Sequence, residues 1–297
     1  MFKRIKMKFK IFFILFFSFS LVSAQEVKLF PLKKYRVSVL QDSLKESSGL
    51  NFFGNRLFTF NDSGNTSEIF EMNFQTGKIV KKYPTQLQNT DWEALTNDGK
   101  AFYIGDFGNN TGNRKDLKIF KIPFKNDSLQ MQNLYEISFF YPEQNNFSPK
   151  NLNTNFDAEG MIFYSDKINI FTKEWVSKSV SRYEINPNLK GNQAARKLES
   201  YPTKFVVTDA AYYNKKLFLV GYTKKTEVFL NIFNEDENGM FFNQKPQSFY
   251  LGTALAIGQV EGIAVNEEGV YISSEKFVFP FGSTKPSFYF IPKIQLP

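Results

Sequence analysis

The sequence predicts an all-β protein: a single β-propeller of five four-stranded blades, closed by its N-terminal strand. Five segments share one pattern of apolar runs and turns, and their anchor residues lie 45 to 66 residues apart. No segment keeps a helical period over three turns. Aromatic residues make up 18% of the chain, mostly Phe, which suits a large β-rich core.

Each repeat opens with an apolar run that carries a small residue, and a second apolar run begins eight residues later. A turn rich in Asn, Asp, Gly or Lys separates the two runs, so each unit predicts a β-hairpin. The small residues are Gly49, Ala94, Gly160, Ala210 and Gly262. The second runs open at Leu57, Phe102, Ile168, Phe218 and Val270.

A third apolar run follows each hairpin, and three units then reach Tyr-Pro, at residues 83–84, 141–142 and 201–202. Proline there fits an outer edge strand or its exit. Four antiparallel strands in a repeat of about 40–50 residues are typical of a propeller blade. The second interval, 66 residues long, contains two loop-like stretches. An atypical blade within it would make six blades, which is the alternative.

The last repeat has a third strand but little sequence after it. The segment "KKYRVSVL", residues 33–40, is expected to supply the missing fourth strand and so close the ring. We therefore predict one propeller domain over residues 25–297.

Residues 1–24 have the pattern of a Sec-type signal peptide: a basic start, an apolar stretch and a small-residue end, with cleavage after Ala24. The expected location is the periplasm or the cell exterior. No later segment is long and apolar enough for a membrane span. The leader carries five of the positive charges, so subtracting five from +8 leaves +3. This small net charge argues against nucleic-acid binding. We also expect the protein to be a monomer.

The chain contains no His and no Cys. This excludes a Ser-His-Asp triad, a disulfide framework and most zinc sites. Any chemistry must come from Asp, Glu, Lys, Arg, Tyr, Ser or a bound hard metal.

Polar residues are expected to converge at one mouth of the central channel. In a propeller the first strand of each blade lies nearest the axis, and the second runs antiparallel to it. The start of the first strand and the end of the second therefore emerge on the same face. Acids begin the first strands: Glu46, Asp91, Glu93, Asp157, Glu159, Asp209 and Glu261. Polar residues close the second strands: Asp62, Asp106, Lys173, Glu174, Tyr222, Glu275 and Lys276.

Such a ring of carboxylates needs counter-charge, because they cannot all ionise at close range. Ca²⁺ is one solution, since it takes six to eight oxygen ligands. The expected metal ligands are Asp91, Glu93, Asp157, Glu159, Asp209 and Glu261. Basic side chains from the same face are another solution: Lys173, Lys224, Lys225, Lys276, Arg114 and Lys115. Alternatively, the acids accept backbone N–H bonds from the neighbouring blade and are structural.

A small-molecule or glycan ligand is also expected at this mouth. Two similar turns, "NDSGN" and "GDFGNN", each place an Asp there. "FTKEW" adds a Trp beside Lys and Glu, and this Trp either lines a pocket or packs. The ligand-binding candidates are Asp62, Asp106, Lys173, Glu174, Trp175 and Lys276.

The motifs "ESSGL…FNDSGN", "DWEAL…GDFGNN", "DAEGM" and "VEGIA" resemble the secreted and periplasmic propellers called SdiA-regulated proteins and the related esterase-like or phytase-like propeller domains. The resemblance runs from Glu46 to the C-terminus and implies calcium at acidic positions. The Glu-Gly of the inner strand is similar to calcium-dependent lactonase propellers, where such a Glu binds the metal; Glu93, Glu159 and Glu261 match. Ser48 takes that position in the first repeat, and the lack of His departs from a paraoxonase-style base.

Three functions stay open from the sequence. A metal-dependent hydrolase of phosphoesters or lactones would need a compact carboxylate cluster with a nearby Lys. A non-catalytic binding propeller would show aromatic residues among the acids. A structural propeller would have acids satisfied by backbone N–H groups.

Overall fold

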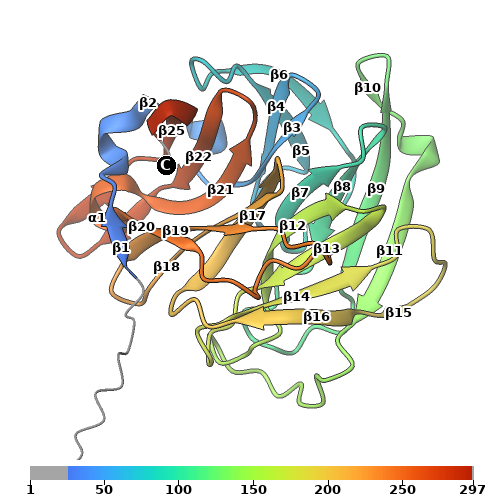
Figure 1. Ribbon diagram of the computed structural model, residues 1–297. Coiled ribbons are helices and arrows are strands. Elements are labelled where there is room, and N and C mark those ends of the chain that lie inside the picture. The colour runs from blue at the N-terminus through green and yellow to red at the C-terminus, as the bar shows by residue number, and fades with distance from the viewer. Residues whose placement is uncertain (1–25, 296–297) are drawn as a thin grey trace, which may run out of the picture.

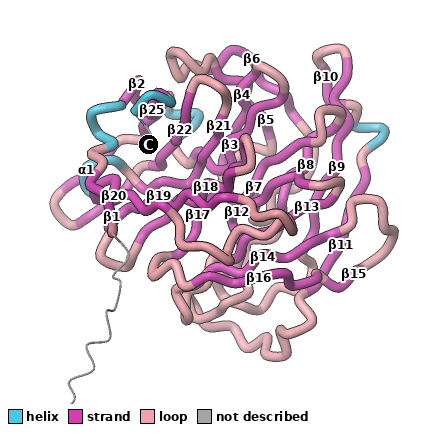
Figure 2. Tube along the Cα trace, viewed as in Figure 1, coloured by secondary structure: helices cyan, strands magenta, loops and turns pink. Residues whose placement is uncertain are grey.

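The computed structural model describes residues 26–295, and the predicted signal peptide, residues 1–24, lies outside them. Five β-sheets stand around a central axis, as Figure 1 shows. Strands form nearly all of the regular structure, with a few short helical turns (Figure 2). The prediction of a five-bladed propeller is confirmed.

The first two blades contain consecutive antiparallel strands. Blade 1 consists of β3 (Ser47–Phe53), β4 (Arg56–Asn61), β5 (Glu68–Met72) and β6 (Ile79–Pro84). Blade 2 consists of β7 (Trp92–Asn97), β8 (Ala101–Asp106), β9 (Lys118–Lys125) and β11 (Tyr135–Phe140), with β10 (Ser128–Leu129) and β15 (Gln193–Ala194) added to it. The stretches 107–117 and 141–157 contain no strand, so the long second interval holds loops and no sixth blade.

The other three blades follow the same order. Blade 3 consists of β12 (Ala158–Tyr164), β13 (Lys167–Thr172), β14 (Val180–Ile185) and β16 (Arg196–Tyr201). Blade 4 consists of β17 (Val206–Tyr213), β18 (Lys216–Tyr222), β19 (Glu227–Asn234) and β20 (Gln247–Thr253), with β1 (Val27–Leu29) parallel to β20. Blade 5 consists of β21 (Gln259–Val265), β22 (Gly269–Glu275), β25 (Ser287–Pro292) and β2 (Arg36–Val39).

Short elements connect the blades. The α-helix α1 (Ala254–Ile257) leads from blade 4 into blade 5, and the hairpin β23 (Phe277–Phe279) and β24 (Gly282–Thr284) follows β22. The 3₁₀ turns are η1 (Leu32–Tyr35), η2 (Asp42–Leu44), η3 (Met131–Asn133) and η4 (Lys293–Gln295).

The apolar core lies between the blades. Five clusters of buried side chains each join two neighbouring blades, for example Phe58 of blade 1 with Phe102 of blade 2. The inner strands β3, β7, β12, β17 and β21 contact one another in ring order. Each blade therefore depends on two neighbours for burial of its two faces, which requires the ring to close.

Strand β2 closes the ring as the sequence predicts. It pairs antiparallel with β25, with Ser38 opposite Phe288 and Val39 opposite Ser287. The next residue, Leu40, donates its N–H to the Pro286 carbonyl at 2.9 Å and is 3% exposed. Leu40 packs in the cluster between blades 5 and 1.

Every inner strand carries one β-bulge near its start. The bulged residues are Gly49, Glu93, Glu159, Thr208 and Glu261. A bulge re-aims a side chain and strengthens the local twist. The alignment of the five repeats on their small residues is therefore wrong by one residue in blades 1 and 4. In blade 1, Gly49 and not Ser48 occupies the bulge position that Glu93 has in blade 2. In blade 4, Asp209 and not Ala210 is the first residue after the bulge.

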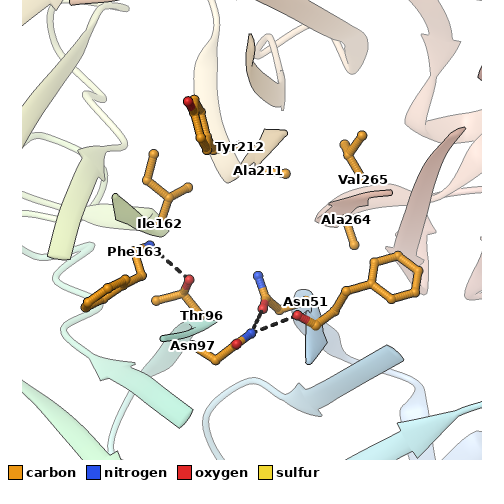
Figure 3. A pocket seen from close by; sticks show the side chains of 10 residues that line it. Asn51, Thr96, Asn97, Ile162, Phe163, Ala211, Tyr212, Ala264 and Val265 are labelled. Carbon is orange, nitrogen blue, oxygen red and sulfur yellow. Dashed lines mark hydrogen bonds between the residues drawn. The ribbon is translucent and has the colours of Figure 1, made fainter. Parts of the chain in front are cut away.

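The end of the channel opposite the bulges holds a cavity of about 170 Å³, drawn in Figure 3. The far ends of all five inner strands line it. There Asn97 Nδ2 donates to Asn51 Oδ1 at 2.5 Å, and the Phe163 N–H donates to Thr96 Oγ1 at 3.0 Å. Side chains thus link blades 1, 2 and 3 at this end.

We expect Leu40→Ala to lower the free energy of unfolding by about 2–4 kcal/mol, because it leaves a cavity where β2 closes the ring. Val39→Ala, at a side chain that is 45% exposed, should change it by less than about 0.5 kcal/mol. Urea unfolding measures both. Equal small effects would show that closure contributes little to stability.

Candidate functional site

A compact carboxylate cluster lies at the mouth of the channel, between blades 1 and 2. Asp62 follows β4, Asp91 precedes β7, and Glu93 is the bulged residue of β7. One carboxylate oxygen of each lies within 4.8 Å of the other two. The structure thus brings together three of the candidates that the sequence singles out.

Glu93 is the most enclosed of the three. It is 4% exposed, and among residues 26–295 no hydrogen-bond donor contacts its carboxylate. Burial raises the pKa of Glu93 well above its ordinary value, and the negative charges of Asp62, Glu159 and Asp91 add to the shift. A carboxylate without a protein donor in such a place is stabilised by a proton or a cation.

Asp62 and Asp91, the other two acids of the cluster, also have raised pKa values. Burial raises the pKa of Asp62 to about 7, although the Ser63 backbone N–H partly offsets the effect. Burial also raises the pKa of Asp91, while the positive charge of Arg114 acts in the opposite direction. All three carboxyls therefore bind a proton more tightly in the folded chain than in water.

Gly108 keeps open the space where two of these carboxylates meet. A Cβ on Gly108 would lie 2.3 Å from Asp91 Oδ2 and 2.3 Å from Glu93 Oε1. Its backbone N–H also donates to the Asp91 carbonyl at 3.2 Å. The sequence analysis places Asp106 of the turn "GDFGNN" at the mouth but assigns no role to Gly108, whose packing against the acids appears only in three dimensions.

Asp106 positions the cluster rather than joining it. Its buried Oδ1 accepts from Arg114 Nη2 at 3.0 Å and from the Asp91 N–H at 3.2 Å. Its Oδ2 is buried and has no partner among the described residues. Asp106 therefore fixes the start of β7 and brings the Arg114 charge close to Asp91.

Lys173 occupies the other side of the mouth. It is 4% exposed, and its ammonium contacts the Glu159 carboxylate. It also lies over the rings of Trp175 and Tyr222, at 5.1 and 5.4 Å from their centres. Burial acts to lower the pKa of Lys173, but the charge of Glu159 and of other acids outweighs it, so the pKa is raised and the amine is charged.

Two of the expected metal ligands are already hydrogen-bonded. Asp157 accepts from the Asn109 N–H at 2.7 Å and from Trp175 Nε1 at 2.8 Å. Asp209 accepts from three backbone N–H groups, those of Ile263 at 2.7 Å, Ala210 at 2.7 Å and Leu50 at 3.4 Å. These acids tie neighbouring blades together, which is the structural alternative stated from the sequence.

Glu261 belongs to the Lys173 side of the mouth. Its Oε1 accepts from Gln259 Nε2 at 2.6 Å. Burial raises the pKa of Glu261, and the positive charge of Lys173 acts in the opposite direction on both Glu261 and Glu159. Glu159 and Glu261 thus form one group with Lys173, separate from the Asp62, Asp91 and Glu93 cluster.

Two ligand candidates lie away from both groups. The Glu174 carboxylate accepts from Thr172 Oγ1 at 3.0 Å and Ser181 Oγ at 2.6 Å, within blade 3. Lys276 is exposed and makes no ion pair among the described residues. Side chains of successive residues point in opposite directions along a strand. Lys173 points into the channel, so its neighbour Glu174 points away, and Glu275 points inward, so Lys276 points away.

Glu275 therefore faces the mouth in place of Lys276. Burial raises the pKa of Glu275 well above its ordinary value, and the charges of Glu261 and Asp62 add to the shift. The sequence analysis names Lys276, and not Glu275, as the ligand-binding candidate, because the residue at which β22 ends, and so which of the two points inward, is known only from the structure.

Comparison with known proteins supports the fold alone. No family model matches the sequence, and no curated protein matches it. Among solved structures, a glucose dehydrogenase has a TM-score of 0.50 at 10% identity, covering 86% of this chain and 98% of that one. The resemblance to SdiA-regulated and phytase-like propellers stays a prediction.

Two further solved structures are less similar. A protein described as a 6-phosphogluconolactonase from Bacteroides uniformis has a TM-score of 0.37 at 14% identity, covering 80% of this chain and 69% of that one. The hydrazine synthase of Kuenenia stuttgartiensis has a TM-score of 0.38 at 12% identity, covering 79% of this chain. The chain spans 57% of the length of that hydrazine synthase chain.

The described part of the chain contains no helix long and apolar enough to cross a membrane.

Asp209→Ala should lower the free energy of unfolding by about 3 kcal/mol or more, because it leaves buried backbone donors without an acceptor. Asp209→Asn keeps one acceptor oxygen and should cost less. Chemical unfolding of the two variants measures the difference. A loss below about 1 kcal/mol for Asp209→Ala would contradict the structural role.

Without divalent cations, the melting temperature should fall as pH rises from 5 to 8. A carboxyl with a raised pKa binds protons more tightly when folded, so the stability that it contributes is greatest below its unfolded pKa and is lost as pH rises to the folded pKa. That pKa is about 7 for Asp62 and about 6 for Asp157. Asp62→Asn should flatten the decline in thermal melts, and an unchanged slope would contradict the assignment.

Proposed function

We propose that the chain is a secreted or periplasmic, calcium-dependent hydrolase of phosphoesters or lactones, with Asp62, Asp91 and Glu93 as the metal ligands. The observation that carries the proposal is the convergence of these three carboxylates, one of them buried and unpartnered. Such a cluster together with a nearby Lys is the arrangement that distinguishes a hydrolase from the two other hypotheses.

The donor set fits a hard cation. All three side chains offer carboxylate oxygens, the ligands that Ca²⁺ takes, and three acids leave positions for water or substrate. A divalent cation would also compensate the negative charge that burial makes costly. Gly108 supports the fit, because any side chain there would enter the space beside Asp91 and Glu93. Extracellular calcium modules bind in the range of about 0.1–1 mM, and we expect a similar affinity.

The calcium, when bound, would polarise the scissile group and activate water. The residues of the chain do the rest. Lys173 holds a positive charge in the mouth, paired with Glu159 and enclosed by Trp175 and Tyr222. In the proposed reaction it would bind an anionic part of the substrate. Arg114 and Asp106 keep Asp91 in place.

A second candidate is a non-catalytic binding propeller. The enclosure of Lys173 by two aromatic rings favours it, since an aromatic and cationic pocket can bind a small molecule or glycan without chemistry. Binding of a ligand by a protein that shows no turnover would distinguish this function from the first.

Calcium at 100 times its dissociation constant should stabilise residues 26–297 by about 2.7 kcal/mol, which raises the melting temperature by roughly 5 °C over the value in EDTA. Glu93→Gln and Gly108→Ala should each weaken calcium binding at least about tenfold, measured by calorimetry. A chromogenic phosphomonoester and a δ-lactone would test turnover.

Glu237→Gln is the matched control, because Glu237 is exposed in the loop between β19 and β20. It should leave the calcium affinity unchanged. Absence of bound metal and of any shift in the melt would reject the calcium site. Calcium binding without turnover of either substrate would leave the binding propeller as the function.

A further inference from the structure

A hairpin at the mouth face presents apolar side chains to solvent. Phe281, at the turn between β23 and β24, is 96% exposed, and Val278 on β23 is 68% exposed. Leu255 of α1, beside the hairpin, is 48% exposed. Three large apolar side chains are thus exposed within one small region.

The hairpin is held firmly against the propeller. Phe277 packs on the core cluster between blades 4 and 5, and Phe279 stacks on Phe277 with ring centres 6.3 Å apart. Thr284 Oγ1 donates to the Leu255 carbonyl at 2.6 Å. Because side chains alternate along a strand, the inward Phe277 and Phe279 direct Val278 outward.

Exposed lysines surround this region. Lys276 and Lys285 flank the hairpin at its base, and the Lys276 N–H donates to the Lys45 carbonyl at 3.1 Å. The Ala254 N–H donates to the Thr226 carbonyl at 2.8 Å, which places the turn with Lys224 and Lys225 beside α1. Among the described residues, none of these five lysines forms an ion pair.

We propose that this hairpin and its lysines dock the protein on the surface of a membrane that contains anionic lipids. Apolar side chains enter the interface between headgroups and acyl chains, and nearby lysines are attracted to the negative surface. A protein partner fits less well, since stable protein interfaces bury about 800 Å² on each side and this tip offers only three apolar side chains.

The most buried acids of the mouth lie below the lysines. Glu93, Glu159 and Glu261 are 3–5% exposed, whereas the five lysines are exposed around the mouth. Asp62, Asp91 and Glu275 are half-buried, and Asp42, in the turn before Lys45, is exposed. The lysines therefore face the lipid surface first. Docking would turn the mouth of the channel towards the membrane. The inference rests on the hairpin and is independent of the proposed hydrolase.

Vesicle sedimentation tests the proposal with residues 26–297, which include every described element. The vesicles contain phosphatidylcholine alone or with 30% phosphatidylglycerol, and EDTA is present so that no cation bridges protein and lipid. We expect binding only to the anionic vesicles. Phe281→Ser should weaken it about tenfold. Lys276→Gln with Lys285→Gln should weaken it about thirtyfold.

Matched controls lie at the opposite end of the propeller. Val80→Ser changes a valine that is 60% exposed on β6, and Lys100→Gln with Lys215→Gln changes exposed turn lysines. Both controls should bind like the unchanged protein. Phe281→Trp adds an exposed probe to a chain whose two Trp are buried, and its emission should shift to the blue on anionic vesicles.

No binding to anionic vesicles would overturn the proposal, as would equal binding by Phe281→Ser. Binding that survives in the lysine variant would also overturn it, because charge would then play no part. A dimer in solution that Phe281→Ser abolishes, without any vesicle binding, would show that the hairpin is a contact between two copies instead.

Discussion

The burial of many carboxylates close to one axis is the constraint on which the structure depends. Five inner strands meet around a narrow channel, and their bulges turn Glu93, Glu159 and Glu261 into it. Each buried charge needs a proton, a hydrogen-bond donor or a counter-ion. Different acids of the mouth are stabilised in different ways. Acids that accept hydrogen bonds from neighbouring blades are structural, and acids without such donors are the candidates for function.

Backbone N–H groups satisfy Asp209, and an N–H group together with the Trp175 indole satisfies Asp157. The positive charge of Lys173 compensates the negative charges of Glu159 and Glu261. The carboxylates of Asp62, Asp91 and Glu93 form no ion pair within the described residues, and only Ser63 and the charges of Arg114 and Lys173 compensate them. Glu275 forms no ion pair among these residues either. The hydrolase proposal therefore concerns carboxylates whose negative charge no basic residue of the channel pairs directly.

The mouth face combines this recessed negative channel with an exposed basic and apolar rim. The two features come from different parts of the chain: the bulged inner strands supply the acids, and the hairpin after β22 supplies the rim. A surface that orients the molecule and a channel that opens on the same side would together restrict which molecules reach the acids. Both features stand on separate observations, so each can fail without the other.

The sequence alone determines the five blades, their strand order and the closing strand, because period-2 apolar runs and turn residues are local signals that repeat. It also places the acids at one mouth, since antiparallel strands fix which ends meet. Only the tertiary structure decides which acids accept backbone hydrogen bonds and which are left as candidate metal ligands. A bulge shifts the side-chain register by one residue, so Asp209 turns to backbone donors and Glu93 enters the channel. The separation of Glu275 from Lys276 and the space beside Gly108 likewise depend on contacts between residues far apart in the chain.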